Sequence, residues 1–335
     1  MRSSAPQHRA ASRTGTITRF ERNLVSMQQI TPRDDSFHFA QMGERWWMTE
    51  TIWFAFCVPE RRLGGWIYTM VRPNIGTVAG GAWVWDDTGA LPWEALYSRN
   101  LTALRLPDNA DLNDITFPTG TSLRTLEPLT SYQITYEDED YLRASLRFDA
   151  VMPPRPLRKP GSAFGDLTHF DQFGRVQGAL QLRGETIPVD CLAIRDRSWG
   201  PRPEHRPRKS AYVTGIASAS SAFLAVTKSN ALSEELAYGF LIRDGDIGDL
   251  VSGRRHVERD PATGWVKTIT IEAVDEHGRK LLATGTRLSG IVLNRHSFID
   301  NNSLIVWSID GEIAHGEDQD MWPVHEWSQY RRTGV

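Results

Sequence analysis

The sequence predicts an all-β fold of antiparallel strands in two halves. Strand-like runs recur through most of the chain, about sixteen of them, at the spacing typical of antiparallel sandwiches and barrels. Sustained helical periodicity is nearly absent. Twelve tryptophans among 335 residues supply large apolar side chains that can pack a barrel or line a cavity inside it. Together these observations favour barrel halves that enclose an apolar ligand.

The first half contains the clearest strands. Residues 51–58 are apolar on both alternations, which suits a strand buried on both faces. Residues 65–71 and 77–85 flank a Pro-Asn-Ile-Gly turn and predict a hairpin. Trp83 and Trp85 are two residues apart, so they share one face of the second strand and are candidate substrate-binding residues.

A proline-rich, basic segment from residue 152 interrupts the strand pattern, because proline removes backbone donors and disfavours both regular structures. It predicts a connection between two domains. The first residues are rich in Arg, Ser and Thr and lack an apolar core, so they predict a disordered leader rather than a secretory signal. The expected division is a leader at 1–35, an N-terminal β domain at 36–151, a crossover at 152–163 and a C-terminal β domain at 164–335.

Composition excludes several functions. A net charge of −3 gives no general attraction to nucleic acid. No run approaches the roughly 20 apolar residues of a membrane-spanning helix, and we expect a cytoplasmic protein. Cys57 and Cys191 lie in apolar strand-like runs and predict buried, reduced thiols. Whether the chain forms a homo-oligomer is left open by the sequence.

Common catalytic motifs are missing. The chain has no Gly-x-Gly-x-x-Gly after a strand, no phosphate-binding Gly-x-x-x-x-Gly-Lys and no His-Glu-x-x-His. A Gly-x-Ser-x-Gly elbow is absent as well. The sequence therefore gives no motif support for four classes of enzyme: nicotinamide dehydrogenases, nucleotide hydrolases, zincins and α/β-hydrolases. We expect neither a cofactor nor a metal ion.

Asp196 is the most informative acidic residue. It follows an apolar strand, and Arg195, Arg197 and Arg202 surround it in the sequence. Held by these arginines, it would have only a structural role. If strand alternation turns Arg195 and Arg197 to the other face, Asp196 faces an apolar pocket, where burial raises its pKa and makes it a proton donor. Trp199 would then shape the pocket or stabilise a cation.

A second candidate cluster is His169-Phe170-Asp171-Gln172. On a strand, His169 and Asp171 face the same way. They are candidate catalytic residues that act as acid, base or orienting groups. Gln172 and Arg202 are candidate substrate-binding residues. In the alternative interpretation, Asp171 only caps a loop.

A third cluster is acidic and lies near the C-terminus, at Glu317, Asp318, Gln319 and Asp320. It lacks the spacing of a calcium loop. We expect a solvated loop that pairs with the basic residues 202–209. Alternatively, Glu317 or Asp318 closes one end of the pocket.

Two short motifs resemble those of a family of bacterial two-domain lipocalin-like proteins, which includes carotenoid hydratases (hydroxyneurosporene synthase) and AttH-like proteins. They are His169-x-Asp171-Gln172 and Arg195-Asp196-x-Ser198-Trp199-Gly200, separated by a strand with Gly178 and a Gly184 turn. The resemblance implies two lipocalin-like β-barrel halves and cofactor-free addition of water to an isoprenoid double bond. It also implies that Asp196 is the acid and Trp199 a pocket wall. Arg197 and Ser198 replace a more acidic pair of the hydratases, so the resemblance does not carry over the substrate.

The leading hypothesis is a hydratase- or dehydratase-type lyase, or an isomerase, that acts on an isoprenoid-, steroid- or polyketide-like molecule by acid catalysis from Asp196. His169 or Asp171 would take up the second proton or hold water. The first alternative is a non-catalytic protein that binds a hydrophobic ligand. A second alternative, metal-dependent hydrolysis, requires an ion bound by His169, Asp171 and the acidic cluster.

Overall fold

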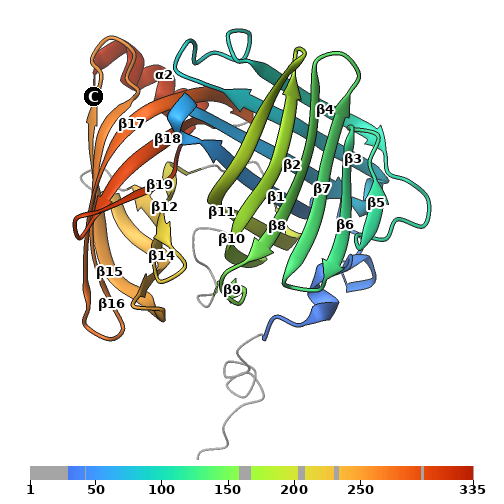
Figure 1. Cartoon of the computed structure of the whole chain (residues 1–335), viewed down its shortest axis with the longest axis horizontal. Coiled ribbons are helices and arrows are strands. Elements are labelled where there is room, and N and C mark those ends of the chain that lie inside the picture. The colour runs from blue at the N-terminus through green and yellow to red at the C-terminus, as the bar shows by residue number, and fades with distance from the viewer. Residues whose placement is uncertain are drawn as a thin grey trace, which may run out of the picture.

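The structure is a computed structural model that describes residues 29–41, 43–157, 167–202, 208–229, 234–295 and 298–334. It consists of a curled eleven-stranded antiparallel sheet and a closed eight-stranded barrel beside it (Figure 1). This confirms the predicted all-β fold of two lipocalin-like barrel halves. The N-terminal half is a half-barrel, and the C-terminal half is closed.

The curled sheet has the strand order β4-β3-β2-β1-β11-β10-β8-β7-β6-β5, and β9 pairs with β10 at the side. Its strands are β1 (Met48–Val58), β2 (Leu63–Arg72), β3 (Thr77–Trp85), β4 (Tyr97–Arg105), β5 (Asp114–Thr116), β6 (Thr121–Glu127), β7 (Ser131–Asp138), β8 (Leu142–Ala150), β9 (Arg155–Pro156), β10 (Thr168–Leu182) and β11 (Glu185–Pro201).

The barrel closes in sequence order from β12 to β19. Its strands are β12 (Ser210–Ser218), β13 (Ser221–Ser229), β14 (Glu234–Arg243), β15 (Asp246–Arg259), β16 (Val266–Asp275), β17 (Lys280–Arg295), β18 (Phe298–Ile309) and β19 (Glu312–Pro323), followed by the helix α2 (Val324–Thr333). No helix in the described part of the chain is long and apolar enough to cross a membrane.

The change from sheet to barrel lies between β11 and β12, later than the expected crossover at 152–163. Part of that expected crossover, residues 158–163, lies outside the described residues. β10 and β11 are the longest strands of the curled sheet, and they join β8 to β1. Gly178 in β10 has φ 146°, and a Cβ at this position would lie 2.0 Å from the Ser145 carbonyl oxygen, so the close pairing with β8 requires glycine.

The end of the expected leader is structured, whereas residues 1–28 lie outside the described residues. Pro32–Asp35 form a short 3-10 helix. Asp35 is buried, and it accepts a hydrogen bond from the Tyr132 hydroxyl (2.7 Å) and pairs with Arg195 (3.4 Å). A buried arginine needs such an anionic partner, so the segment around Asp35 contributes to the packing of the N-terminal half.

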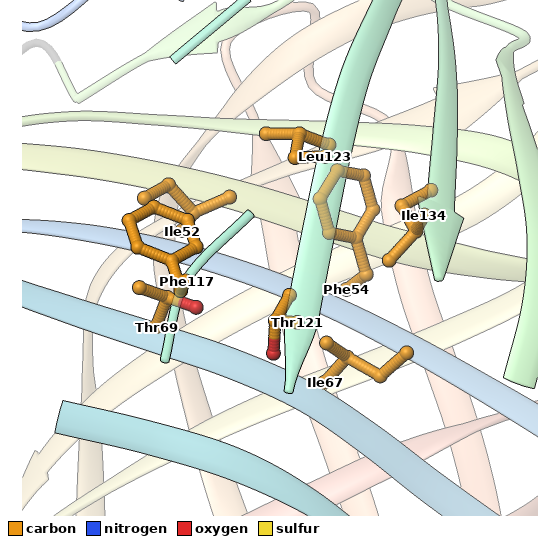
Figure 2. A pocket seen from close by; sticks show the side chains of 8 residues that line it. All are labelled: Ile52, Phe54, Ile67, Thr69, Phe117, Thr121, Leu123 and Ile134. Carbon is orange, nitrogen blue, oxygen red and sulfur yellow. The ribbon is translucent and has the colours of Figure 1, made fainter. Parts of the chain in front are cut away.

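The two faces of the curled sheet have different neighbours. Ile52 and Phe54 of β1 line a small apolar pocket inside the curl (Figure 2). Trp53, between them, faces the barrel, where its ring contacts that of Tyr212 edge-on at 5.8 Å. Alternation along β1 therefore separates an inner apolar face from a face that packs against the barrel. The other residues that line the pocket are Ile67, Thr69, Phe117, Thr121, Leu123 and Ile134.

The acidic C-terminal cluster is not a solvated loop. It lies in β19, and its members are buried. Asp318 and Asp320 pair with Arg255 (2.7 Å and 3.3 Å), and Asp320 also pairs with Arg259 (2.6 Å). Arginines of β15 are therefore the partners of these two acids among the described residues, whereas residues 203–207 of the expected basic partner lie outside the described part of the chain.

A buried ion pair on the inner face of the curled sheet contributes to its stability, and this contribution can be measured. Glu50 and Arg197 are both buried, and Arg197 Nη2 lies 2.8 Å from Glu50 Oε2. We expect Glu50→Ala to lower the free energy of unfolding by about 3–5 kcal/mol, because it leaves a buried charge without its partner. Urea denaturation measures the loss.

The matched control is Glu185→Ala. Glu185 pairs with Arg61 at the surface, where both side chains are exposed. This variant should change the free energy of unfolding by less than about 1 kcal/mol. Equal losses in the two variants would contradict the importance of the buried pair.

Candidate functional site

Strand register brings the two predicted clusters together. In the antiparallel β10–β11 pair, Asp171 lies directly opposite Asp196. On the other side of β11, Trp53 of β1 lies opposite Asp196. Residues directly opposite each other project to the same face of a sheet. His169, two residues before Asp171, shares that face, which packs against the barrel.

The side chains of His169, Asp171 and Asp196 form one cluster, because their ligand atoms all lie within 4.8 Å of one another. His169 Nε2 is 2.9 Å from Asp171 Oδ1. The hydroxyl of Tyr212, from β12 of the barrel, donates to the same carboxylate oxygen. The site therefore lies where the curled sheet meets the barrel.

Asp196 is the accessible member of the cluster. His169 and Asp171 are buried, whereas Asp196 is partly exposed. Its Oδ1 atom is enclosed and accepts no hydrogen bond from any described residue. A carboxyl oxygen in this position is more stable when protonated, because a neutral carboxyl needs less compensation than a buried charge.

The pKa of Asp196 is raised to about 6. Burial is the main cause and the charge of Asp171 adds to it, while the charges of His169 and Arg202 oppose the shift. Burial alone would lower the pKa of His169, but the charge of Asp171 and the hydrogen bond to it outweigh burial, so that this pKa is raised. The site therefore holds the hydrogen-bonded His169–Asp171 pair beside a carboxyl group whose pKa is about 6.

Polar groups border Asp196 at the end of β11. Arg202 Nη2 donates to Ser198 Oγ (2.9 Å), and Nη1 is 3.5 Å from the Tyr68 hydroxyl. Tyr68 is the cross-strand neighbour of Trp53 in the β1–β2 pair. Arg202, a predicted binding residue, thus lies on the same face as Asp196.

The other tryptophans of this face form an aromatic layer. The Trp66 ring contacts those of Trp53, Trp83 and Trp85 edge-on, at 5.3, 6.5 and 6.0 Å. Its Nε1 donates to both carboxylate oxygens of Glu317 (2.9 and 2.7 Å). Trp83 and Trp85 thus belong to the wall beyond Trp66, and Glu317 is the member of the acidic cluster that faces the sheet.

Trp199 and Gln172 lie on the opposite face of the sheet from Asp196. Trp199 stacks on His38 at 4.0 Å. Gln172 accepts a hydrogen bond from Arg195 Nε (2.7 Å) on the inner face. Trp199 lies three positions after Asp196, an odd spacing, so the alternation of a strand points their side chains to opposite faces. The expectation that Trp199 forms a pocket wall beside Asp196 is therefore wrong.

Strand alternation also points Arg195 and Arg197 to the opposite face of the sheet from Asp196. Arg195 pairs with Asp35, and Arg197 with Glu50, both on the inner face. The structural alternative, in which these two arginines clamp Asp196, does not hold. Sequence reasoning missed Trp53 and Tyr212 because neither belongs to a motif and each reaches the site only through strand pairing.

His169, Asp171 and Asp196 are close enough to hold a metal ion together. The contact between His169 Nε2 and Asp171 Oδ1 already engages one ligand atom of each residue, which fits proton transfer. Elemental analysis of purified protein distinguishes the two arrangements.

Residues 31–320 match a family described as a domain of unknown function (DUF7064). The chain belongs to this family. A search of curated proteins finds no match to this DUF7064 protein.

Solved structures share its fold. The AttH-like protein of Nitrosomonas europaea is 14% identical, covers 88% of this chain and 96% of its own, and has a TM-score of 0.61. Kievitone hydratase of Nectria haematococca is 9% identical, covers 89% and 94%, and has a TM-score of 0.55. CghA, solved with Sch210972, is 12% identical, covers 82% and 87%, and has a TM-score of 0.54. The predicted resemblance to this lipocalin-like group is confirmed at the level of the fold.

The raised pKa of Asp196 predicts a specific dependence of stability on pH. Because the folded state binds this proton more tightly, the contribution of Asp196 is favourable below its ordinary pKa of 3.8 and is lost as pH rises to about 6. The difference between these pKa values corresponds to about 3 kcal/mol. We expect Asp196→Asn to gain up to this stability, relative to wild type, between pH 4 and pH 8 in urea denaturation.

Asp190→Asn is the control on the same strand. Asp190 is exposed, and the hydrogen bond from Arg175 lowers its pKa. This variant should show no stabilisation at pH 8. An Asp196→Asn effect that does not vary with pH would contradict the raised pKa.

Proposed function

We propose that the protein is a cofactor-independent hydratase- or dehydratase-type lyase, or an isomerase, that acts on a hydrophobic small molecule with Asp196 as the proton donor. The observation that carries the proposal is the carboxyl group of Asp196. Its Oδ1 is enclosed without a hydrogen bond, its pKa is about 6, and it lies beside the His169–Asp171 pair. A group with a pKa near the working pH is suited to donate and accept protons.

The surroundings support acid catalysis on an apolar molecule. The protonated Asp196 transfers its proton to an alkene carbon or to a leaving hydroxyl group, and a carbocation develops. Trp53, opposite Asp196, and the Trp66 ring beside it offer aromatic faces to this charge. His169 and Asp171 hold water, or take up the second proton, on the same face.

The fold comparisons agree with this chemistry. One neighbour is a hydratase by name, and another was solved with a small molecule. We extend these properties to this chain only as part of the proposal. An isoprenoid, steroid or polyketide-like substrate fits the abundance of tryptophan on this face.

A non-catalytic ligand-binding protein is the second candidate, and the apolar pocket inside the curled sheet favours it. In that case the bound molecule lies among Ile52, Phe54 and Phe117, away from Asp196. Substitution of Asp196 would then leave binding unchanged.

Native mass spectrometry and organic extraction of freshly purified protein identify a bound compound for assay. We expect Asp196→Asn to lower its turnover by at least about 100-fold, because general acid catalysis typically contributes a factor of this size or more. The control is again Asp190→Asn, which should keep the wild-type rate. Unchanged turnover in Asp196→Asn would refute the proposal and favour the binding protein.

A further inference from the structure

A second buried carboxyl group lies on the barrel side of the interface. Asp300 in β18 is fully buried, and among the described residues neither of its oxygens has a hydrogen-bond partner. Its ionic contact is with Arg295 Nη1 at 3.6 Å, which is too long for a hydrogen bond. A buried acid with so little compensation has no evident structural benefit.

Arg295 links this acid to the sheet. Its guanidinium lies over the Tyr68 ring at 4.7 Å, and also near the rings of Phe298 (5.7 Å) and Trp66 (6.0 Å). Tyr68 belongs to the same row of cross-strand neighbours as Trp53 and Asp196. The positive charge of Arg295 opposes the effect of burial on the pKa of both Asp196 and Asp300. The guanidinium is therefore close to both carboxyl groups.

The charges around Asp300 favour its protonated form. Its pKa is raised to about 7, mainly by burial and also by the charges of Asp320 and Asp318 on β19, while Arg295 opposes the shift. Glu317, also on β19, has its own pKa raised by burial and in part by Asp300. On the sheet side, Asp196 exchanges its proton near pH 6. Between these values Asp300 is mostly protonated and Asp196 mostly ionised, which is the starting state for a dehydration. A hydration starts from the less populated state in which Asp196 holds the proton and Asp300 is ionised.

We propose that Asp300 is the second proton-transfer group of the site, on the barrel wall opposite the sheet, and that Arg295 couples it to Asp196. This rests on the proposed function. It fits the state of His169 and Asp171, which are already engaged with each other and, through Asp171, with Tyr212.

The two carboxyl groups together account for the protons that are donated and taken up in a hydration. Asp196 gives its proton to one alkene carbon, and the π electrons form the new C–H bond. Water attacks the resulting cation through its oxygen and loses one proton to the carboxylate of Asp300. Dehydration is the reverse: Asp300 protonates the leaving hydroxyl group, and Asp196 removes a proton from carbon. After each hydration, proton exchange with solvent removes the proton from Asp300 and restores the proton on Asp196. After each dehydration the exchange runs in the opposite direction.

The first test uses protons alone as the probe. In full-length protein with ¹³C-labelled aspartate, NMR follows the carboxyl carbon of Asp300 as pH changes, and the loss of its signal in Asp300→Asn assigns it. Asp196 is ionised in the pH range where Asp300 titrates. We therefore expect Asp196→Asn to lower the titration midpoint of Asp300 by at least about 0.5 pH units, because Arg295 then acts on Asp300 alone. The control is Asp310→Asn, an exposed acid just after β18 that pairs with Arg243. An unchanged Asp300 midpoint in Asp196→Asn would overturn the coupling.

The second test follows turnover of the extracted compound in D₂O. Asp300→Asn should slow deuterium incorporation by at least about 100-fold and remove one limb of the pH–rate profile. Asp300→Glu should restore part of the rate. If Asp196→Asn is inactive while Asp300→Asn keeps the wild-type rate and profile, the role of Asp300 is wrong and the proposed function stands. If Asp196→Asn remains active, the proposed function itself fails.

Discussion

The antiparallel pairing of β10 with β11 determines the chemistry of the site. It places Asp171 directly opposite Asp196 on a face that the barrel covers. Two carboxylates in such proximity repel each other, and burial strengthens the repulsion. The pair is stable only if cations or protons compensate it. His169 and the Tyr212 hydroxyl compensate Asp171, and a proton compensates Asp196.

Alternation along β11 keeps opposite charges on opposite faces. Arg195 and Arg197 point to the inner face, where Asp35 and Glu50 neutralise them. Asp196, between them, points to the barrel, and its Oδ1 accepts no hydrogen bond from any described residue. The same sheet therefore contains fully compensated charges that stabilise the fold and an incompletely compensated acid that is available for reaction. The aromatic layer around Trp66 lies on the face of the sheet that packs against the barrel, and it limits the access of water to Asp196.

Much of the fold and part of the site can be predicted from sequence. Turn spacing and alternation predict all-β halves, and the two-residue spacing predicts that His169 and Asp171 share a face. The proximity of Asp196 to Asp171 depends on strand register, which local patterns do not determine. The motif around Asp196 wrongly suggests that Trp199 lines the same pocket. In a strand, two residues an odd number of positions apart point to opposite faces of the sheet. Asp300 is unrecognisable in sequence, because it reaches the interface only when the barrel closes.

The position of a bound molecule tests the central claim most directly. A crystal structure of the full chain with the apolar compound extracted from it would show which face of the curled sheet holds the molecule. The account predicts electron density between the sheet and the barrel, in contact with the Asp196 carboxyl group and the Trp53 ring. Density confined to the pocket among Ile52, Phe54 and Phe117 would contradict it, because that pocket lies on the other face of the sheet.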